Sequence, residues 1–127
     1  MAKALYSQII WQHYRQPLNR HKLSKPNLKF AGANYSCGDQ LAFYVKLDKQ
    51  GKIKAVGWQG GGCAIAQASA SVFSELIKGK TLTQVKKLTN QTVLKKLKLK
   101  LSPTRIKCAL LPLHIIKDQE KLLKLEL

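Results

Sequence analysis

Residues 41–57 read LAFYVKLDKQGKIKAVG, and this stretch decides the fold class. Its first half has an apolar residue at every second position, a period of two that predicts a strand with one buried face; these residues are Leu41, Phe43, Val45 and Leu47. The next four residues form a turn, in which Gly51 is able to adopt a positive φ. A second alternation from Ile53 to Gly57 then predicts an antiparallel hairpin.

The segments on either side of this hairpin complete the predicted fold. Leu28 and Phe30 begin a further strand just upstream. Helices are predicted over residues 4–14, from about residue 63 to 79, after a capping box at residues 81–84, over residues 90–96, and from Ser102 and Pro103 onward. Pro112 should kink or restart the last of them. The order predicts one α+β domain over residues 1–127, with a small antiparallel three-stranded sheet packed by helices.

The composition of the chain limits the classes of protein to which it can belong. Hydrophobic residues make up 45% of the 127 residues, which is enough for a packed core. We expect a cytoplasmic protein that makes no use of a membrane, because the apolar stretches are too short to span one and no signal-peptide core is present. The net charge of +17 attracts acidic partners, but no zinc-finger spacing or aromatic RNA-binding strand accompanies it. No specific nucleic acid is therefore expected.

Cys37-Gly38-Asp39 is the first of three motifs with metal-binding chemistry. Residues two apart on an extended chain point the same way, so this thiolate and carboxylate can face one metal ion. Taken alone, the motif favours a plain turn that contains a buried cysteine over a metal site. We expect Asp39 to be a loop residue at the rim of the site.

Gly60-Gly61-Gly62-Cys63 lies where the third predicted strand meets the next helix. Glycines carry no side chain, so a ligand or partner can approach the backbone closely there. At a helix N-terminus, Cys63 would be favoured as a thiolate by the unpaired N–H groups and the helix dipole. Tight packing is the structural alternative, and neither a P-loop nor a dinucleotide-binding fingerprint is present.

Arg105-Ile106-Lys107-Cys108 lies in the first turns of the last predicted helix. Two neighbouring cations would lower the pKa of the Cys108 thiol, so Arg105 and Lys107 are expected to modulate the site. Three thiolates and one carboxylate make a tetrahedral set that suits zinc or a cluster iron. The histidines are expected to be surface or packing residues, namely His13, His21 and His114.

The three motifs together resemble the iron–sulfur cluster scaffold family of IscU, SufU and the N-terminal domain of NifU. The similarity extends in order over nearly the whole chain, through Tyr6-Ser7, His13-Tyr14, Pro17-Leu18-Asn19, Cys37-Gly38-Asp39, the run from Gly60 to Ser71, and Arg105-Ile106-Lys107-Cys108-Ala109. It implies that Cys37, Asp39, Cys63 and Cys108 converge on zinc or a [2Fe–2S] cluster at one end of the fold. It also implies a protein with no turnover chemistry of its own, which takes sulfur from a cysteine desulfurase and serves recipient apoproteins.

Two departures from the family pattern bear on the role. IscU has a histidine before its last cysteine, whereas Lys107 stands here and has no lone pair to offer a metal. This form is similar to SufU, whose members act as zinc-bound sulfur acceptors, although the short interval from Cys63 to Cys108 is similar to IscU. Residues 101–105 match only part of the segment by which IscU engages its chaperone, so a chaperone is the least supported partner.

Sulfur transfer requires a thiol that is exposed and partly ionised. On that basis Cys108 is predicted to be the first sulfur acceptor, with Cys37 as the alternative. Two other classes of function remain open at this point. The charge of +17 motivates a basic nucleic-acid-binding zinc module, and Cys63 or Cys108 motivates a thiol enzyme, although the sequence places no catalytic histidine beside either.

Overall fold

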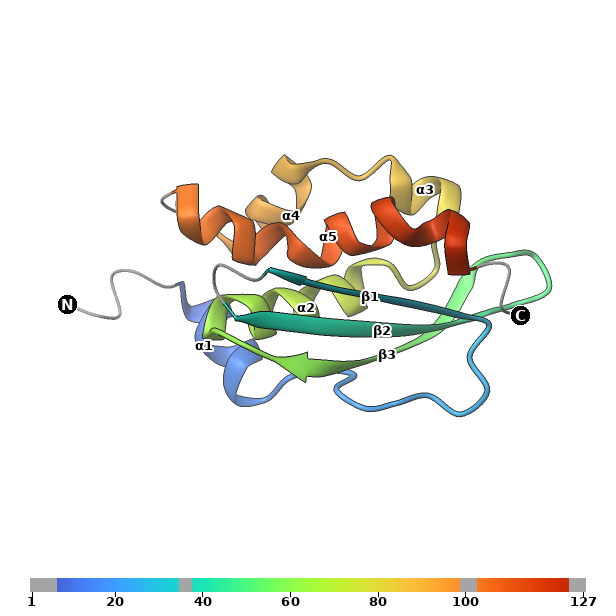
Figure 1. The fold of residues 1–127 in the computed structure, drawn as a ribbon, viewed down its shortest axis with the longest axis horizontal. Helices are drawn as coiled ribbons and strands as arrows, with labels where there is room; N and C mark the ends of the chain where they lie inside the picture. Colours follow the sequence, from blue (N-terminus) through green and yellow to red (C-terminus); the bar gives the residue numbers. More distant parts are fainter. Residues whose placement is uncertain (1–6, 35–37, 99–102, 124–127) are drawn as a thin grey trace.

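The computed structural model describes residues 7–34, 38–98 and 103–123. Their elements follow one another as α1 (Gln8–Arg15), β1 (Leu28–Asn34), β2 (Asp39–Leu47), β3 (Ile53–Gly61), α2 (Ala64–Leu76), α3 (Leu82–Lys86), α4 (Asn90–Leu97) and α5 (Pro103–Leu123). The strands form one antiparallel sheet in the order β1-β2-β3, with α2 and α5 packed against one of its faces (Figure 1). The predicted α+β fold with a small three-stranded sheet is confirmed.

The sheet places its largest side chains on the face that the helices cover. Phe30, Phe43 and Trp58 form one row across the three strands, and none of the three is accessible to solvent. The sequence predicted that the glycine run would end β3, but the strand continues through Gly60 and Gly61, which pair with Leu41 and Gln40. Backbone pairing does not require side chains, so the glycines extend β3 as far as the start of α2.

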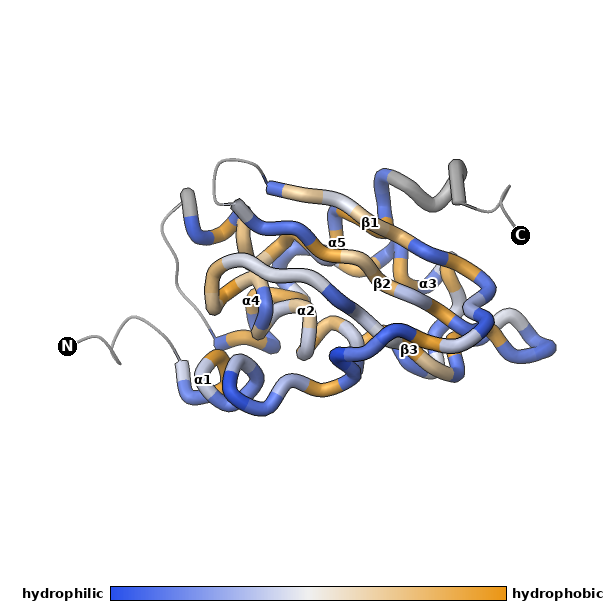
Figure 2. Tube along the Cα trace, turned by 60° about the horizontal axis from the view of Figure 1, so that its bottom comes forward, coloured by the Kyte–Doolittle hydropathy of each residue, from blue (hydrophilic) through white to orange (hydrophobic). Residues whose placement is uncertain are grey.

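Helix α2 lies between the sheet, α1 and α5. Its buried positions surround the helix and run from Ile65 and Ala66 to Phe73 and Ser74. Alanine and serine fill most of these positions, and their small side chains let neighbouring elements approach closely. The tube of α2 is pale to orange, while the turn between β2 and β3 is blue, in agreement with a central helix and an exposed hairpin (Figure 2).

The other helices follow local signals in the sequence. Helix α1 begins after Ser7, whose hydroxyl accepts the N–H of Ile10, so the described part of the helix starts later than expected and residues 4–6 lie outside the described range. The capping box of α3 is confirmed, with Thr81 and Gln84 each accepting the backbone N–H of the other. Helix α5 does not restart at Pro112 but continues to Leu123. None of the described helices combines the length and the apolar content needed to cross a bilayer.

The segment after α1 covers the free edge of β3. The backbone N–H of Trp58 donates to the carbonyl of Asn19 at 2.9 Å, and the indole Nε1 donates to the carbonyl of Leu18 at 2.8 Å. A side chain at Gly57 would collide with the backbone of His21, so glycine is required for this close approach. An edge strand that is covered in this way is protected from pairing with other chains.

A buried polar contact between α1 and α2 predicts a pH dependence of stability. His13 Nδ1 lies 2.6 Å from Ser71 Oγ, and burial lowers the pKa of His13 below its usual 6.5, against a smaller opposing effect of Glu75. Folded His13 therefore binds fewer protons than unfolded His13, so its contribution to stability is complete above pH 6.5 and is lost as the pH falls below that value. Urea unfolding should show a larger loss of stability between about pH 7.5 and 5.5 in the parent than in His13→Gln. Equal losses would contradict this prediction.

Candidate metal and sulfur site

Asp39 is the first residue of β2 and lies on the helix-covered face, opposite Asn34 of β1. Its side chain is completely buried, so the expectation of a loop residue at the rim is wrong. Strand pairing explains the difference, because the side chain of Asp39 lies on the same face of the sheet as those of Leu41 and Phe43. The Asp39 carboxylate accepts the backbone N–H of Cys63 through Oδ1 at 2.8 Å, which joins β2 to the start of α2.

Gly62 makes room for this carboxylate. Its φ is +137°, and a Cβ at this position would lie 2.8 Å from the Asp39 Cα and closer still to Oδ1. At Gly60, a Cβ would lie 2.9 Å from the Cα of Leu41. The sequence correctly indicated close approach at the glycine run, but within the described residues the groups that approach belong to the protein's own β2 strand.

Cys63 is the N-cap of α2, as its place after the glycine run predicted. Its Sγ accepts the N–H of Ala66 at 3.4 Å and lies 3.8 Å from Asp39 Oδ2. The N-cap position places this sulfur beside the N–H groups of the first turn of α2. Cys63 is half-buried.

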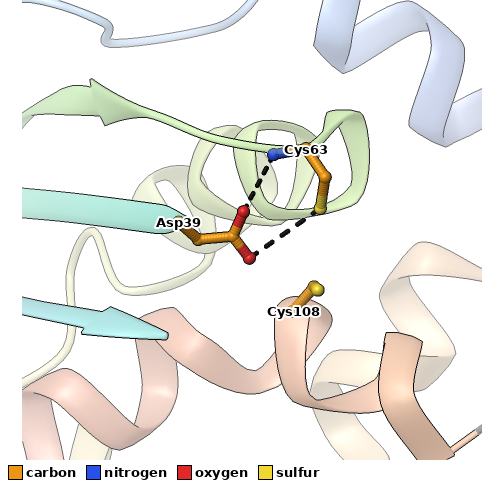
Figure 3. A group of neighbouring side chains, drawn as sticks. All are labelled: Asp39, Cys63 and Cys108. Atoms are coloured by element: carbon orange, nitrogen blue, oxygen red, sulfur yellow. Dashed lines mark hydrogen bonds between the residues drawn. The ribbon is translucent and has the colours of Figure 1, made fainter. Parts of the chain in front are cut away.

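Cys108 enters the site from α5 and points toward Asp39 and Cys63 (Figure 3). The residue is completely buried, contrary to the exposed thiol that the sequence predicted, whereas Arg105 and Lys107 are exposed. Helical geometry accounts for the exposure of Lys107, because a residue adjacent in a helix is rotated by about 100° around its axis. Asn34, which sequence reasoning missed, places its Nδ2 4.0 Å from Cys108 Sγ. Only the strand register, which the motif does not reveal, could have pointed to Asn34.

The structure brings three of the four predicted ligands together. One carboxylate oxygen of Asp39 and the sulfurs of Cys63 and Cys108 lie within 4.8 Å of one another. Tetrahedral zinc with Zn–S bonds of about 2.3 Å would hold two sulfurs about 3.7 Å apart, so small side-chain movements suffice for these residues to fit the ion. Cys37 lies outside the described residues, and its place in the ligand set stays a prediction.

The histidines do not join this group. His13 contacts Ser71 between α1 and α2, and both His21 and His114 are exposed. Their predicted status as surface or packing residues is confirmed. The described site thus offers sulfur and carboxylate donors and has no histidine positioned to act as a base for either thiol.

The structure is thus a three-stranded sheet covered by helices on one face, with a carboxylate and two thiols gathered in a group that could hold a metal ion. The chain belongs to the family of the NifU-like N-terminal domain, whose model matches residues 5–120. Its membership agrees with the resemblance found in the motifs.

Relatives and a solved structure support this assignment. The chain is 34% identical over 118 residues to the iron–sulfur cluster assembly enzyme IscU of Drosophila melanogaster, covering 90% of this chain and 75% of the relative. It is 32% identical to the iron–sulfur cluster assembly scaffold protein IscU of Buchnera aphidicola from Schizaphis graminum, with 88% of each chain covered. A crystal structure assigned to the SUF-system scaffolds, from Fervidobacterium islandicum AW-1, superposes with a TM-score of 0.74 at 28% identity, covering 92% of this chain and 97% of the other.

Proposed function

We propose that this protein is an iron–sulfur cluster assembly scaffold, or a zinc-dependent sulfur acceptor, that binds its cargo at Asp39, Cys63, Cys108 and Cys37. The mutual approach of Asp39, Cys63 and Cys108 to within 4.8 Å carries the proposal. These groups come from β2, the start of α2 and α5, so the fold itself assembles the site. The protein would receive, hold and release sulfur, a metal ion or a cluster, and this role requires no turnover chemistry of its own.

The set of donor atoms favours release of a bound ion or cluster over its permanent storage. Thiolates are soft ligands that suit zinc and cluster iron, while a carboxylate is a harder ligand for the same ions. When bound, zinc would keep its thiolate ligands deprotonated at neutral pH. Asp39 can offer Oδ2 to such an ion while Oδ1 still accepts the Cys63 N–H, because Oδ2 lies 3.8 Å from Cys63 Sγ.

We propose a cysteine desulfurase as the source of sulfur and apoproteins as the recipients, as the resemblance implies. A thiolate of this protein attacks the outer sulfur of the desulfurase persulfide, a new S–S bond forms, and the desulfurase thiolate leaves. Cys108, the predicted first acceptor, is buried and would have to become accessible for this step, which strengthens Cys37 as the alternative. Mass spectrometry of persulfide in each Cys→Ser variant would assign the acceptor. A cytoplasmic location also stays a prediction, and the relative from Debaryomyces hansenii is named as mitochondrial.

Metal and sulfide analysis of protein purified without oxygen tests the proposed function. Iron with acid-labile sulfide would support the scaffold role, and zinc alone would support the sulfur-acceptor role. Protein that binds neither, and that takes up neither zinc nor a reconstituted cluster, would overturn both forms of the proposal.

Asp39→Asn should separate ligation from structure. The amide oxygen can still accept the Cys63 N–H, which lies 2.8 Å from the present carboxylate, but a neutral amide is a poor ligand for zinc. We expect zinc affinity to fall at least about tenfold, by analogy with the 10–100-fold cost of losing an outer-shell partner, with little change in the urea midpoint. Competition with a chromophoric chelator measures this affinity. Unchanged affinity would show that Asp39 serves only as a structural acceptor.

A further inference from the structure

Pro112 alters the helical turn that carries Cys108. In a regular helix, the residue four positions after Cys108 donates its N–H to the Cys108 carbonyl, but proline has no N–H and its ring presses on that carbonyl. Helix α5 nevertheless continues through Pro112, which is buried. The backbone of the turn from Cys108 to Pro112 is therefore held less tightly by its own helix than the turns on either side.

Ser69 of α2 supports this turn from outside the helix. Its hydroxyl, completely buried, donates a short hydrogen bond to the carbonyl of Ala109, the residue after Cys108. Because α2 is also the helix that Cys63 caps, the bond connects the two elements that supply the site's described sulfurs. The Ala109 carbonyl is not the one that Pro112 deprives of its helical donor, so Ser69 does not replace the missing backbone bond but ties the same turn to α2.

We propose that Ser69 and Pro112 are positioning residues for the metal and sulfur site. Pro112 loosens the turn that carries Cys108, and Ser69 fixes that turn to α2 at the separation that lets Cys108, Cys63 and Asp39 hold one ion. The proposal deepens the proposed function and rests on it for the identity of the ion. The positions of the two sulfurs are then set by one hydrogen bond between helices.

The same helix offers a matched control. Ser71 is also a completely buried serine of α2, but its hydroxyl accepts the Leu18 N–H at 2.8 Å and contacts His13, on the side away from α5. Ser71→Ala removes both of these contacts without touching the Cys108 turn. A merely structural role for Ser69 predicts that the two alanine variants behave alike.

The first test compares Ser69→Ala with Ser71→Ala. Zinc affinity, measured with a chromophoric chelator, should fall about tenfold in Ser69→Ala and stay within about twofold of the parent in Ser71→Ala. The visible spectrum of the Co²⁺-substituted protein should change only in Ser69→Ala. Ser69→Thr, which keeps the hydroxyl, should restore the affinity. Similar affinities in Ser69→Ala and the parent would overturn the proposal.

A second measurement uses the metal-free protein. The rate at which a small aromatic disulfide modifies Cys108, located by peptide mass spectrometry, should rise about fivefold in Ser69→Ala, the shift expected from losing one net hydrogen bond. The rate should not change in Ser71→Ala. If the parent protein bound neither zinc nor a cluster, the proposed function would be overturned. The modification rate of Cys108 would still show whether Ser69 positions the turn. Equal rates in the parent and Ser69→Ala would overturn that role.

The third test examines Pro112→Ala, which returns an N–H to the Cys108 carbonyl. The urea midpoint should rise or stay constant, because alanine favours helix far more than proline, while zinc affinity falls about tenfold. Zinc affinity should also fall only about tenfold in the double variant Ser69→Ala with Pro112→Ala, because both residues act on one turn and their effects are not additive. A loss of about a hundredfold in the double variant would contradict their joint action.

Discussion

Gly62→Ala should abolish high-affinity metal binding and destabilise the fold. The new Cβ would lie 2.8 Å from the Asp39 Cα. The backbone at this position has a φ of +137°, which residues other than glycine rarely adopt. Overpacking and backbone strain each cost about 1–3 kcal/mol, so we expect the free energy of unfolding to fall by roughly 2–6 kcal/mol. The Asp39 carboxylate would be pushed away from the Cys63 N–H, and the ligand set would be lost with it.

Gly61→Ala is the control for this prediction. Gly61 ends β3 next to Gly62, and a Cβ there would meet no atom within 4 Å. We expect its zinc affinity to equal that of the parent and its unfolding free energy to change by no more than about 0.5 kcal/mol. Urea unfolding and chelator competition on both variants provide the comparison. A Gly62→Ala protein as stable as Gly61→Ala would show that Asp39 does not depend on this close approach.

Cys63→Ser should abolish metal binding while leaving the metal-free fold intact. Cys63 Sγ caps α2 by accepting the Ala66 N–H at 3.4 Å, and serine is among the preferred N-cap residues. The variant therefore removes a thiolate ligand but keeps the helix cap. We expect zinc affinity to fall by more than the roughly 10–100-fold typical of outer-shell changes. The free energy of unfolding of the apoprotein should stay the same or rise.

Cys63→Ala separates the two roles of this residue. Alanine removes both the ligand and the cap, so zinc binding should again be lost and the apoprotein should be less stable by about 1 kcal/mol. Chelator competition and urea unfolding distinguish the three proteins. Retention of zinc in Cys63→Ser at the parent's affinity would exclude Cys63 from the ligand set.

The sequence predicted the fold well where the signals are local. The alternation in residues 41–57 and the turn at Gly51 correspond to β2, the hairpin and β3, and the capping box of α3 has the predicted hydrogen bonds. The end of β3 was misplaced because a glycine run has no side-chain periodicity, yet its backbone groups still pair. The continuation of α5 through Pro112 depends on tertiary packing around a buried proline, which a local rule does not include.

The sequence predicted the proximity of three side chains more accurately than their burial. Asp39, Cys63 and Cys108 meet as expected, but Asp39 and Cys108 are buried, which depends on strand register and helix phase. Neither quantity follows from a three-residue motif. The contacts of Asn34 and Ser69 join segments 74 and 40 residues apart in sequence, so no local pattern could have revealed them.

The origin of the ligands in three separate segments also has a consequence for biosynthesis. Asp39 and Cys63 lie on segments that pair early in the chain, whereas Cys108 arrives on the final helix, which must pack against both β1 and α2. A chain emerging from the ribosome in the N-to-C direction therefore has two of these ligands before the third is made. The three side chains come together only when α5 docks, so a nascent chain cannot offer all three to an ion before α5 has packed against β1 and α2.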